Sequence, residues 1–209
     1  MSYEPVPDGE LAAVVTYLEM RAPPALPIPQ SALSLRRLEA PGPAAYRHLF
    51  RLVGARWLWF SRLIMDDAEL VAIIRHPQVE LFAVAAHDSA EAGMLELDFR
   101  EPGECELAFI GLVPELAGRG HGRWLLAEAL RLAWRQDEER PGIRRVHVHT
   151  CTLDHPAALA AYRRAGFTAY RRAVERFRDP RLLGILPADC APQLPVVGTL
   201  TSASPAPAS

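Results

Sequence analysis

The chain has 209 residues, half of them hydrophobic and 23% charged, which is typical of one globular domain. Its formal net charge of −2 gives no electrostatic basis for binding nucleic acid or an anionic membrane. Three cysteines without paired spacing argue against a disulfide framework and a zinc site, and no apolar run reaches the roughly 18 residues that a membrane span needs.

The first part of the chain predicts one strand and two helices. Residues 13–19 combine β-branched and apolar side chains, as strands do. The proline-rich stretch at 23–29 excludes regular helix and central strand. Helical spacing of apolar residues predicts helices over 43–53 and 66–75, and Asp66 is the expected N-cap of the second helix.

The rest of the chain alternates between strand and helix patterns. These patterns predict, in chain order, strands at 80–86, 92–99 and 104–113, a helix at 120–136, a strand at 146–151, a helix at 156–165 and a strand at 167–177. The first three strands are joined by short loops, such as the polar loop at 87–91, and should form a meander. Gly166 is the expected C-cap of the last helix. The whole order predicts an α+β fold around one mixed sheet.

The composition shifts after the last predicted strand. Residues 179–209 are rich in Pro, Ala, Ser and Leu, and residues 199–209 carry no charge. We therefore expect a single domain over 1–178 and a C-terminal extension over 179–209 whose end is disordered. The apolar part of this extension, 182–197, either covers a neighbouring molecule or packs on its own domain.

Three alternate glycines, Gly118, Gly120 and Gly122, stand between a predicted strand and the long helix. Glycine lets the backbone turn tightly and come close to a ligand, and the free N–H groups at a helix start favour an anion. The segment therefore predicts a phosphate-binding loop. A P-loop is excluded because Gly-Lys-Ser/Thr is absent, and Arg123 stands where a Rossmann fingerprint needs its third glycine.

The neighbouring cations strengthen this interpretation. One charge at a helix start gains only about 0.3–1 kcal/mol, so a pyrophosphate needs several N–H contacts and cations together. Arg119 and Arg123 supply permanent cations, and His121 supplies one when protonated.

Residues 112–126 resemble the acyl-CoA loop of the GNAT superfamily of N-acetyltransferases. The family pattern is Arg/Gln-x-x-Gly-x-Gly/Ala, and Gly120 and Gly122 match it, with Ala117 where Arg or Gln is usual. A second segment, 154–167, resembles the family's Asn-x-x-Ala-x-x-Leu-Tyr-x-x-x-Gly-Phe. The matching residues are Ala158, Tyr162, Gly166 and Phe167, whereas His155 and Ala161 stand where Asn and Leu are usual.

The resemblance implies a GNAT-like fold, with a mixed, mostly antiparallel central sheet of six to seven strands flanked by four helices. It also implies acetyl-CoA as the acyl donor and no metal. The residues expected to contact the CoA are Leu112 and Val113 through their backbone, Gly118, Arg119, Gly120, His121, Gly122 and Arg123 around the pyrophosphate, and His155. The strand end at Leu112 and Val113 is where we expect any β-bulge.

Acetyl transfer to an amine needs a proton acceptor for the amine and a proton donor for the departing thiolate. The resemblance places Tyr162 near the CoA sulfur, and a phenol with a pKa of about 10 stays protonated at neutral pH. It also places Glu106 at the position of a catalytic glutamate, acting directly or through a water. Glu104, which shares a strand face with Glu106, is the alternative base.

Other polar and aromatic residues allow weaker hypotheses. His147 and His149 lie two apart on a strand but have no third ligand with metal-like spacing, so we expect no metal. Cys151 lacks an identifiable base that would make it a nucleophile. Trp57, Trp59 and Phe60 either wall an acceptor pocket or pack in the core, and Tyr17 and Glu19 either reach the acceptor or form a plain strand surface.

The leading hypothesis is an acetyl-CoA-dependent acyltransferase in which a primary amine attacks the thioester directly. The alternative is a non-catalytic acyl-CoA-binding sensor or scaffold. The acceptor is a small molecule or a peptide whose identity is open, and we expect no nucleic-acid or membrane partner. A homodimer is possible on the resemblance. The acidic, proline-containing N-terminus predicts no secretory signal, so we expect a cytoplasmic location.

Overall fold

The computed structural model describes residues 2–86, 91–116, 118–135 and 142–198. Its elements are β1 (Glu10–Met20), β2 (Ser34–Arg37), α1 (Pro43–Gly54), α2 (Asp67–Ile74), β3 (Val79–Ala85), β4 (Glu91–Asp98), β5 (Glu104–Leu112), α3 (His121–Ala133), β6 (Arg145–Cys151), α4 (Ala158–Arg164) and β7 (Thr168–Arg178), with short 3₁₀ turns at Ala55–Trp57 and Pro114–Leu116. Most of the loop predicted at 87–91, Ala117, Gln136 at the expected helix end, and the tail at 199–209 lie outside these described residues.

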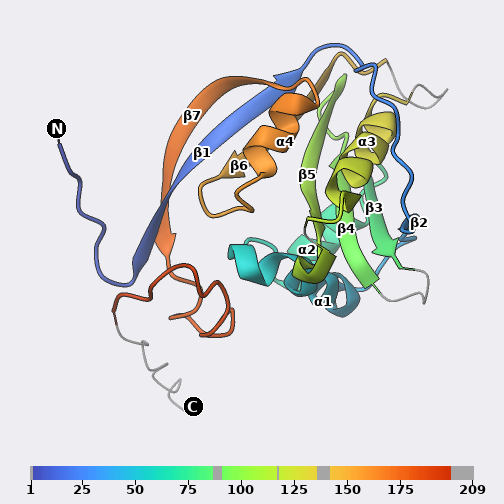
Figure 1. The fold of residues 1–209 in the computed structure, drawn as a ribbon. Helices are drawn as coiled ribbons and strands as arrows, with labels where there is room; N and C mark the ends of the chain where they lie inside the picture. The colour runs from blue at the N-terminus through green and yellow to red at the C-terminus, as the bar shows by residue number, and fades with distance from the viewer. Residues whose placement is uncertain (1, 87–90, 117, 136–141, 199–209) are drawn as a thin grey trace.

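One seven-stranded sheet, in the order β2-β3-β4-β5-β6-β1-β7, organises the molecule (Figure 1). All neighbouring strands are antiparallel except β5 and β6, which are parallel. The predicted mixed, mostly antiparallel sheet is therefore confirmed. The first strand of this sequence, β1, lies between β6 and β7, so strands from opposite ends of the sequence are neighbours in the sheet.

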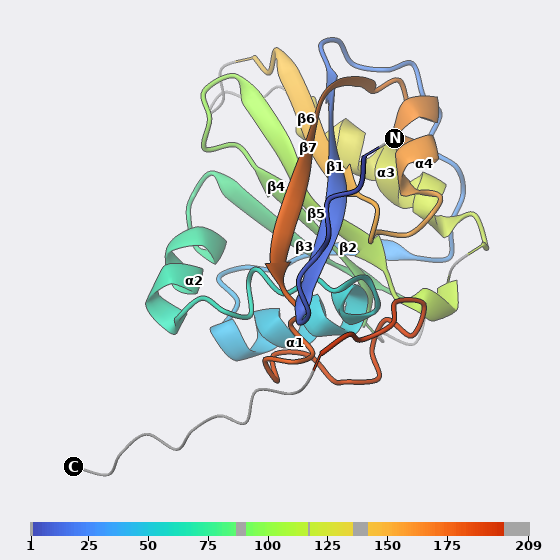
Figure 2. The ribbon, with the colours of Figure 1, turned by 90° about the vertical axis from the view of Figure 1, so that its left-hand side faces the viewer.

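Helices cover both faces of the sheet (Figure 2). α3 packs on one face over β4 and β5, and its buried residues Trp124, Leu125 and Leu130 join a core with Leu97 and Val148. On the other face α1 and α2 pack over β3 and β4. α1, α2 and α3 each bury apolar residues against the sheet, as amphipathic helices do.

Two local predictions about helix ends are confirmed. The Asp66 carboxylate accepts the N–H of Glu69 at 2.8 Å, while the Glu69 side chain accepts the N–H of Asp66 at 3.0 Å, which is a capping box at the start of α2. Gly166 follows the end of α4 with φ = +104°, a backbone conformation that favours glycine.

Two predictions about strands are wrong or incomplete. A short strand, β2, follows the proline-rich connection and pairs with β3 at the edge of the sheet, where four residues of mostly exposed side chains give no recognisable pattern. The β-bulge lies at Ala108, because Glu96 pairs with Phe109 while Leu97 pairs with Leu107. The bulge is thus in the middle of β5 and not at its end. The extra residue reverses which side chains point to each face of the sheet, so that Ile110 packs with the core under α3.

The parallel strands β5 and β6 stay together for only three residue pairs. Glu104 pairs with Arg145, Cys105 with Val146 and Glu106 with His147. Beyond these pairs β5 remains on β4 and β6 remains on β1, so the two strands part. Their separation opens the centre of the sheet at the end where α3 begins.

The C-terminal extension packs on its own domain as far as the structure describes it. Asp179 and Arg181 form an ion pair with both side chains 2% exposed, and the Arg181 guanidinium also donates to the carbonyl of Leu194 at 2.9 Å. Leu186 and Ala191 are buried in a small cluster with Ala13, Leu58 and Leu153. Of the two alternatives for the apolar stretch, packing on the domain is the one observed.

The position of β1 inside the sheet gives a stability prediction. Leu18 is 0% exposed between β6 and β7, whereas Val14 on the same strand is 40% exposed. We expect Leu18→Ala to lower the free energy of unfolding by about 2–5 kcal/mol, because a buried leucine leaves a cavity. Val14→Ala is the matched control and should cost well under half as much. The free energy of unfolding is measured by urea denaturation. Equal and small losses in the two variants would show that β1 is not an integral strand of the sheet.

Candidate active site

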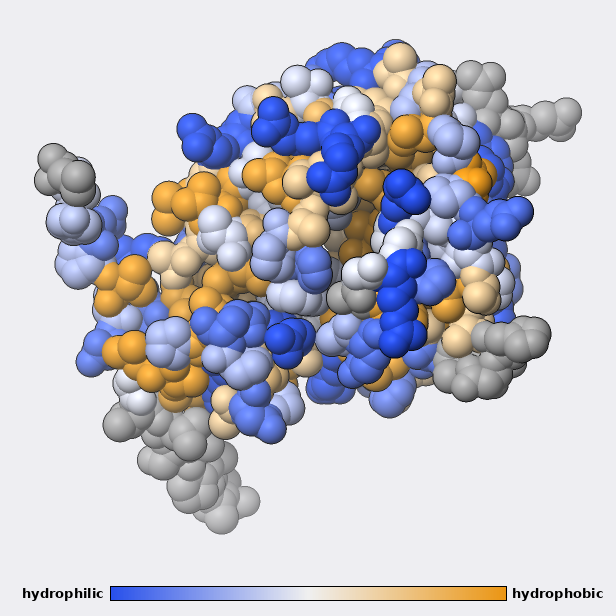
Figure 3. Space-filling view, in the orientation of Figure 1, coloured by the Kyte–Doolittle hydropathy of each residue, from blue (hydrophilic) through white to orange (hydrophobic). Residues whose placement is uncertain are grey.

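A cavity of about 1330 Å³ occupies the gap between β5 and β6. The face seen in Figure 3 is hollowed near its centre, with hydrophobic residues at the bottom of the hollow. The glycine loop, α3 and α4 line one end of the cavity, and the segment at 57–62 with the ends of β6 and β7 lines the other. One cavity therefore joins the predicted CoA loop to the residues predicted to act on an acceptor.

The glycine loop has the backbone that its sequence predicts. Gly118 and Gly120 have φ of +76° and +84°, and a Cβ added at Gly118, Gly120 or Gly122 would meet no atom within 4 Å. α3 begins after Gly120 without a side-chain cap, so its first N–H groups are free of that competitor. An open space over uncapped N–H groups suits a pyrophosphate.

The cations of this loop differ in their placement. Arg123 lines the cavity beside the three glycines, whereas Arg119 and His121 do not. The Nδ1 of His121 lies 3.0 Å from the Ser31 hydroxyl, which ties the proline-rich connection to the start of α3. Arg123 is thus the best-placed of the three for a phosphate.

Leu112, Val113 and His155 also line the cavity. The N–H of Val113 donates to the carbonyl of Ala92 at 2.9 Å, and its carbonyl accepts the N–H of Leu116 at 3.1 Å. A ligand therefore finds the second lone pair of that carbonyl, and not a free N–H. The His155 Nδ1 accepts the N–H of Ala157 at 3.1 Å just before α4, so this histidine stabilises the helix start as well as facing the cavity.

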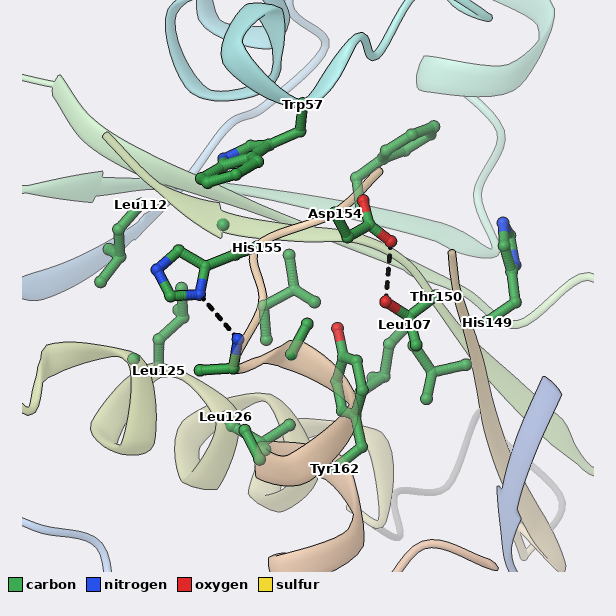
Figure 4. Close-up of a pocket in the computed structure, with 18 of the residues that line it drawn as sticks. Trp57, Leu107, Leu112, Leu125, Leu126, His149, Thr150, Asp154, His155 and Tyr162 are labelled. Atoms are coloured by element: carbon green, nitrogen blue, oxygen red, sulfur yellow. Dashed lines mark hydrogen bonds between the residues drawn. The ribbon is translucent and has the colours of Figure 1, made fainter. Parts of the chain in front are cut away.

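Tyr162 reaches the cavity from α4. Figure 4 shows its hydroxyl directed into the cavity on the side of Thr150 and Asp154. Among the described residues this hydroxyl has no hydrogen-bond partner, while the ring packs edge-on against Phe167 at 5.8 Å. Burial, and then the nearby Asp154 carboxylate, raise the pKa of Tyr162. The phenol therefore keeps its proton and holds it as a free donor inside the cavity.

Glu106 faces the cavity as half of a pair with His149. The Nδ1 of His149 lies 3.3 Å from the Glu106 Oε1, and both residues line the cavity. The hydrogen bond from His149 lowers the pKa of Glu106, against the raised pKa expected of a lone carboxylate in a cleft. The same bond raises the pKa of His149. The sequence alone does not pair the two, because they lie on different strands and the spacing of His147 and His149 points only to metal ligands.

The surroundings of His149 come from several elements. Its side chain is 50% exposed, so it links the half-buried Glu106 to solvent. The other groups that act on it or contact it are His147 on the same strand, Tyr17 on β1, Glu175 on β7 and Asp154 after β6.

The alternative base, Glu104, is held away from the cavity. Its carboxylate accepts from Arg145 at 2.6 Å and lies 3.6 Å from His147, and it does not line the cavity. Glu19 also pairs with Arg145, at 2.7 Å, and Tyr17 contacts the His149 ring at 5.9 Å. These residues form a charged surface beside the pair of Glu106 and His149.

Asp154 is the cavity residue that sequence reasoning missed. Its carboxylate accepts hydrogen bonds from the Thr150 hydroxyl at 2.7 Å, the Cys151 N–H at 2.8 Å and the Trp59 indole N–H at 3.2 Å. It thereby fixes the end of β6 to the loop that carries Trp59. The sequence offered one signal, a carboxylate four residues after a strand threonine, which is too common to identify such a site.

Aromatic residues line the half of the cavity that lies away from the glycine loop, called the far half below. The predicted Trp57, Trp59 and Phe60 line it, together with Phe109 from β5 and Phe177 from β7. Trp59 also packs against the core under α1, so this residue both lines the cavity and packs in the core. Cys151 lines the same half, and burial raises the pKa of its thiol to about 11, which leaves no thiolate at neutral pH.

Two ion pairs complete the far half. Arg62 donates to Glu96 at 2.6 Å, and Glu96 is also bound by the Tyr46 hydroxyl. Arg100 binds the Asp98 carboxylate at 2.6–3.0 Å. Within the described ranges no three His, Cys, Asp or Glu side chains are grouped to hold a metal, and no helix is long and apolar enough to cross a membrane.

The sequence model of the Acetyltransferase (GNAT) family matches residues 46–167. Among curated proteins, none matches the chain. Solved structures share the fold at low identity. A GCN5-related N-acetyltransferase from Sphaerobacter thermophilus is 20% identical with a TM-score of 0.53, over 88% of this chain and 54% of its own.

Two further solved structures are similar. A functionally unknown conserved protein from Staphylococcus epidermidis is 13% identical with a TM-score of 0.52, over 82% of this chain and 63% of its own. An aminoglycoside acetyltransferase from an uncultured soil metagenomic sample, in complex with sisomicin, is 19% identical with a TM-score of 0.52, over 69% of this chain and 93% of its own. The chain thus spans less than two thirds of the first two proteins, and at these identities the similarity concerns the fold alone.

Proposed function

Because the chain belongs to the acetyltransferase (GNAT) family, we propose that it transfers an acetyl group from acetyl-CoA to a primary amine by direct attack. One observation carries the proposal: a single cavity holds the glycine loop at one end, the free Tyr162 hydroxyl in its middle and the pair of Glu106 and His149 beyond it. The acceptor is a small molecule or a peptide. A cytoplasmic location stays a prediction from the sequence.

The pair of Glu106 and His149 is proposed to take the proton of the acceptor amine. An amine must be neutral to attack, and most amines are protonated at neutral pH. Glu106 faces the cavity and accepts the proton, and His149, which is half exposed, passes it to solvent. The lowered pKa of Glu106 makes it a weak base alone, so we propose the pair, not the carboxylate alone, as the base.

Tyr162 is proposed to protonate the departing thiolate. Its raised pKa keeps the phenol protonated, and its hydroxyl has no competing partner among the described residues. The phosphates of acetyl-CoA would lie on the loop at 118–123, with Arg123 as the cation, and its thioester supplies the activated acetyl group. A homodimer also stays a prediction. The outer edge of β7 has no neighbouring strand in the described sheet and is one surface through which a dimer would form.

The second candidate function is a non-catalytic acyl-CoA-binding module that senses or scaffolds. It shares the open glycine loop with the enzyme but requires neither Tyr162 nor Glu106 to be functional. The free hydroxyl and the pair of Glu106 and His149 favour the enzyme, since a binding module has no need for a proton donor and a base on one cavity.

Ligand binding is the first prediction. Acetyl-CoA and desulfo-CoA should both stabilise the protein, by about 2.7 kcal/mol at a hundred times their dissociation constants. The melting temperature should then rise by several degrees for a chain of this size. NAD is the control and should produce no shift. A thermal-shift titration in which neither CoA compound acts would contradict the proposed donor.

Tyr162→Phe removes the proposed proton donor and little else. We expect normal binding of acetyl-CoA and a fall in kcat of about a hundredfold or more, as for loss of a general acid. Tyr170→Phe, on the exposed strand β7, is the matched control and should keep its activity. Full turnover by Tyr162→Phe would remove this residue from the mechanism, while loss of turnover with unchanged binding would exclude the sensor function for the wild type.

The pH dependence tests the proposed base. Since the pKa of His149 is raised, activity of the wild type should fall as the pH drops through a value above the ordinary 6.5 or so of histidine, where the imidazole is protonated and can take no further proton. In His149→Gln the acid limb should move to lower pH, because the Glu106 carboxyl then titrates alone, and the plateau should be lower. kcat/KM is measured against pH with correction for ionisation of the acceptor.

The matched control for this prediction is His147→Gln. His147 lies two residues before His149 on β6, is 3.6 Å from Glu104 and does not line the cavity. Because His147 acts on the pair only through its charge, the acid limb of this variant should shift much less than that of His149→Gln. Identical profiles for the two variants would refute the role of His149.

A further inference from the structure

The far half of the cavity presents aromatic surface to an acceptor. Phe60 and Phe177 pack with their ring centroids 5.0 Å apart and both line the cavity, whereas Trp57 lines it beside His155, with ring centroids 5.1 Å apart. All three side chains are half-buried, in contrast to Phe50, which is 0% exposed in the core. Aromatic rings left partly uncovered inside a cavity offer flat apolar area that a ligand can cover.

The cations of this half are already neutralised. Arg62 is paired with Glu96, Arg100 with Asp98, and His149 with Glu106. A carboxylate on the acceptor would lose its hydration here, and none of these three cations would be free to pair with it. The Arg62 Nε, buried without a partner in the described part of the chain, can still donate to a neutral oxygen. The cavity thus disfavours an anionic acceptor.

The uncompensated charge of this half is small and negative. Glu175 lines the cavity from β7 and has no ion-pair partner among the residues that the structure describes. It lies near enough to His149 to raise the pKa of that histidine. Glu175 can attract one ammonium group, but an acceptor with several cations would find that the other cavity carboxylates of the described residues, Asp98, Glu106 and Asp154, already have partners.

We propose that the acceptor is an amine with a single positive charge and a flat, ring-containing apolar body, and that it carries no carboxylate. The proposal rests on the proposed function and names the substrate class of the same site. The ring lies against Phe60 and Phe177, and the amine points towards Glu106. Glu106 first takes the ammonium proton, which His149 passes to solvent. The neutral nitrogen then bonds to the acetyl carbon, the carbon–sulfur bond breaks, the thiolate takes the proton of Tyr162, and the second proton lost by the nitrogen restores the Tyr162 phenol.

A panel of four amines tests the substrate class with the full-length protein. 2-Phenylethylamine has the ring and one charge, L-phenylalanine adds a carboxylate to the same body, n-hexylamine lacks the ring, and kanamycin is a polycation. CoA release should show the highest kcat/KM for 2-phenylethylamine. Its advantage over n-hexylamine should be about two- to tenfold, the range of one aromatic contact. Equal or better turnover of L-phenylalanine or kanamycin would overturn the proposal.

Variants separate a specific contact from general damage. In Phe60→Leu the kcat/KM for 2-phenylethylamine, divided by the kcat/KM for n-hexylamine, should fall towards one. A structural defect would instead lower both kcat/KM values together. Glu175→Gln should raise KM for 2-phenylethylamine about two- to fivefold, as expected for a partly exposed charge, with kcat unchanged. Glu101→Gln, an exposed residue that does not line the cavity, is the control and should change neither. An unchanged ratio in Phe60→Leu would show that the ring does not lie on this wall.

Failure of this proposal can be told apart from failure of the proposed function. If acetyl-CoA binds and any amine in the panel is acetylated, the enzyme proposal stands and the order of preference decides the substrate class. If acetyl-CoA binds and none of the four is acetylated, the substrate class is rejected. If acetyl-CoA does not bind, both proposals fall together.

Discussion

The whole site depends on the early parting of two parallel strands. β5 and β6 share three residue pairs and then diverge, each held by its other neighbour in the sheet. A sheet normally satisfies the backbone groups of adjacent strands against each other, so a gap in its middle exposes groups and side chains that would otherwise be buried. Here the gap places the glycine loop, Tyr162 and the pair of Glu106 and His149 around one cavity. The bulge at Ala108 lies in the strand that borders this gap and re-aims the residues after it.

Interactions near in sequence were predictable because they are local. The capping box at Asp66, the glycine backbone of the loop at 118–122 and the turn at Gly166 each follow from a few neighbouring residues. Tyr162, which the second motif singles out, also lines the cavity, because α4 carries the middle of that motif. Most strands lie within one residue of their predicted bounds for the same reason. The exceptions are β1, which begins at Glu10 and not at residue 13, and the four-residue β2.

What the sequence could not provide depends on residues far apart in the chain. The pair of Glu106 and His149 exists because two strands separated by α3 lie side by side, and its effect on the carboxyl pKa reversed the expected direction. The Asp154 carboxylate joins the end of β6 to the distant loop of Trp59 through three hydrogen bonds, which no spacing rule describes. The apolar stretch at 182–197 packs on its own domain through contacts with distant residues, because Leu186 and Ala191 lie in one cluster with Ala13 and Leu58.

The place of β1 has a consequence for the order in which the molecule assembles. Val15 pairs with Cys151 and Glu10 with Arg178, so β1 meets its partners in the sheet only after β6 and β7, far along the chain, have been made. Contacts between such distant residues must overcome a large loop-closure entropy and are slow to form. β1 is therefore the closing piece of the sheet: until it inserts, β7 has no neighbour, and the wall that carries Glu175 and Phe177 stays detached from the rest of the cavity.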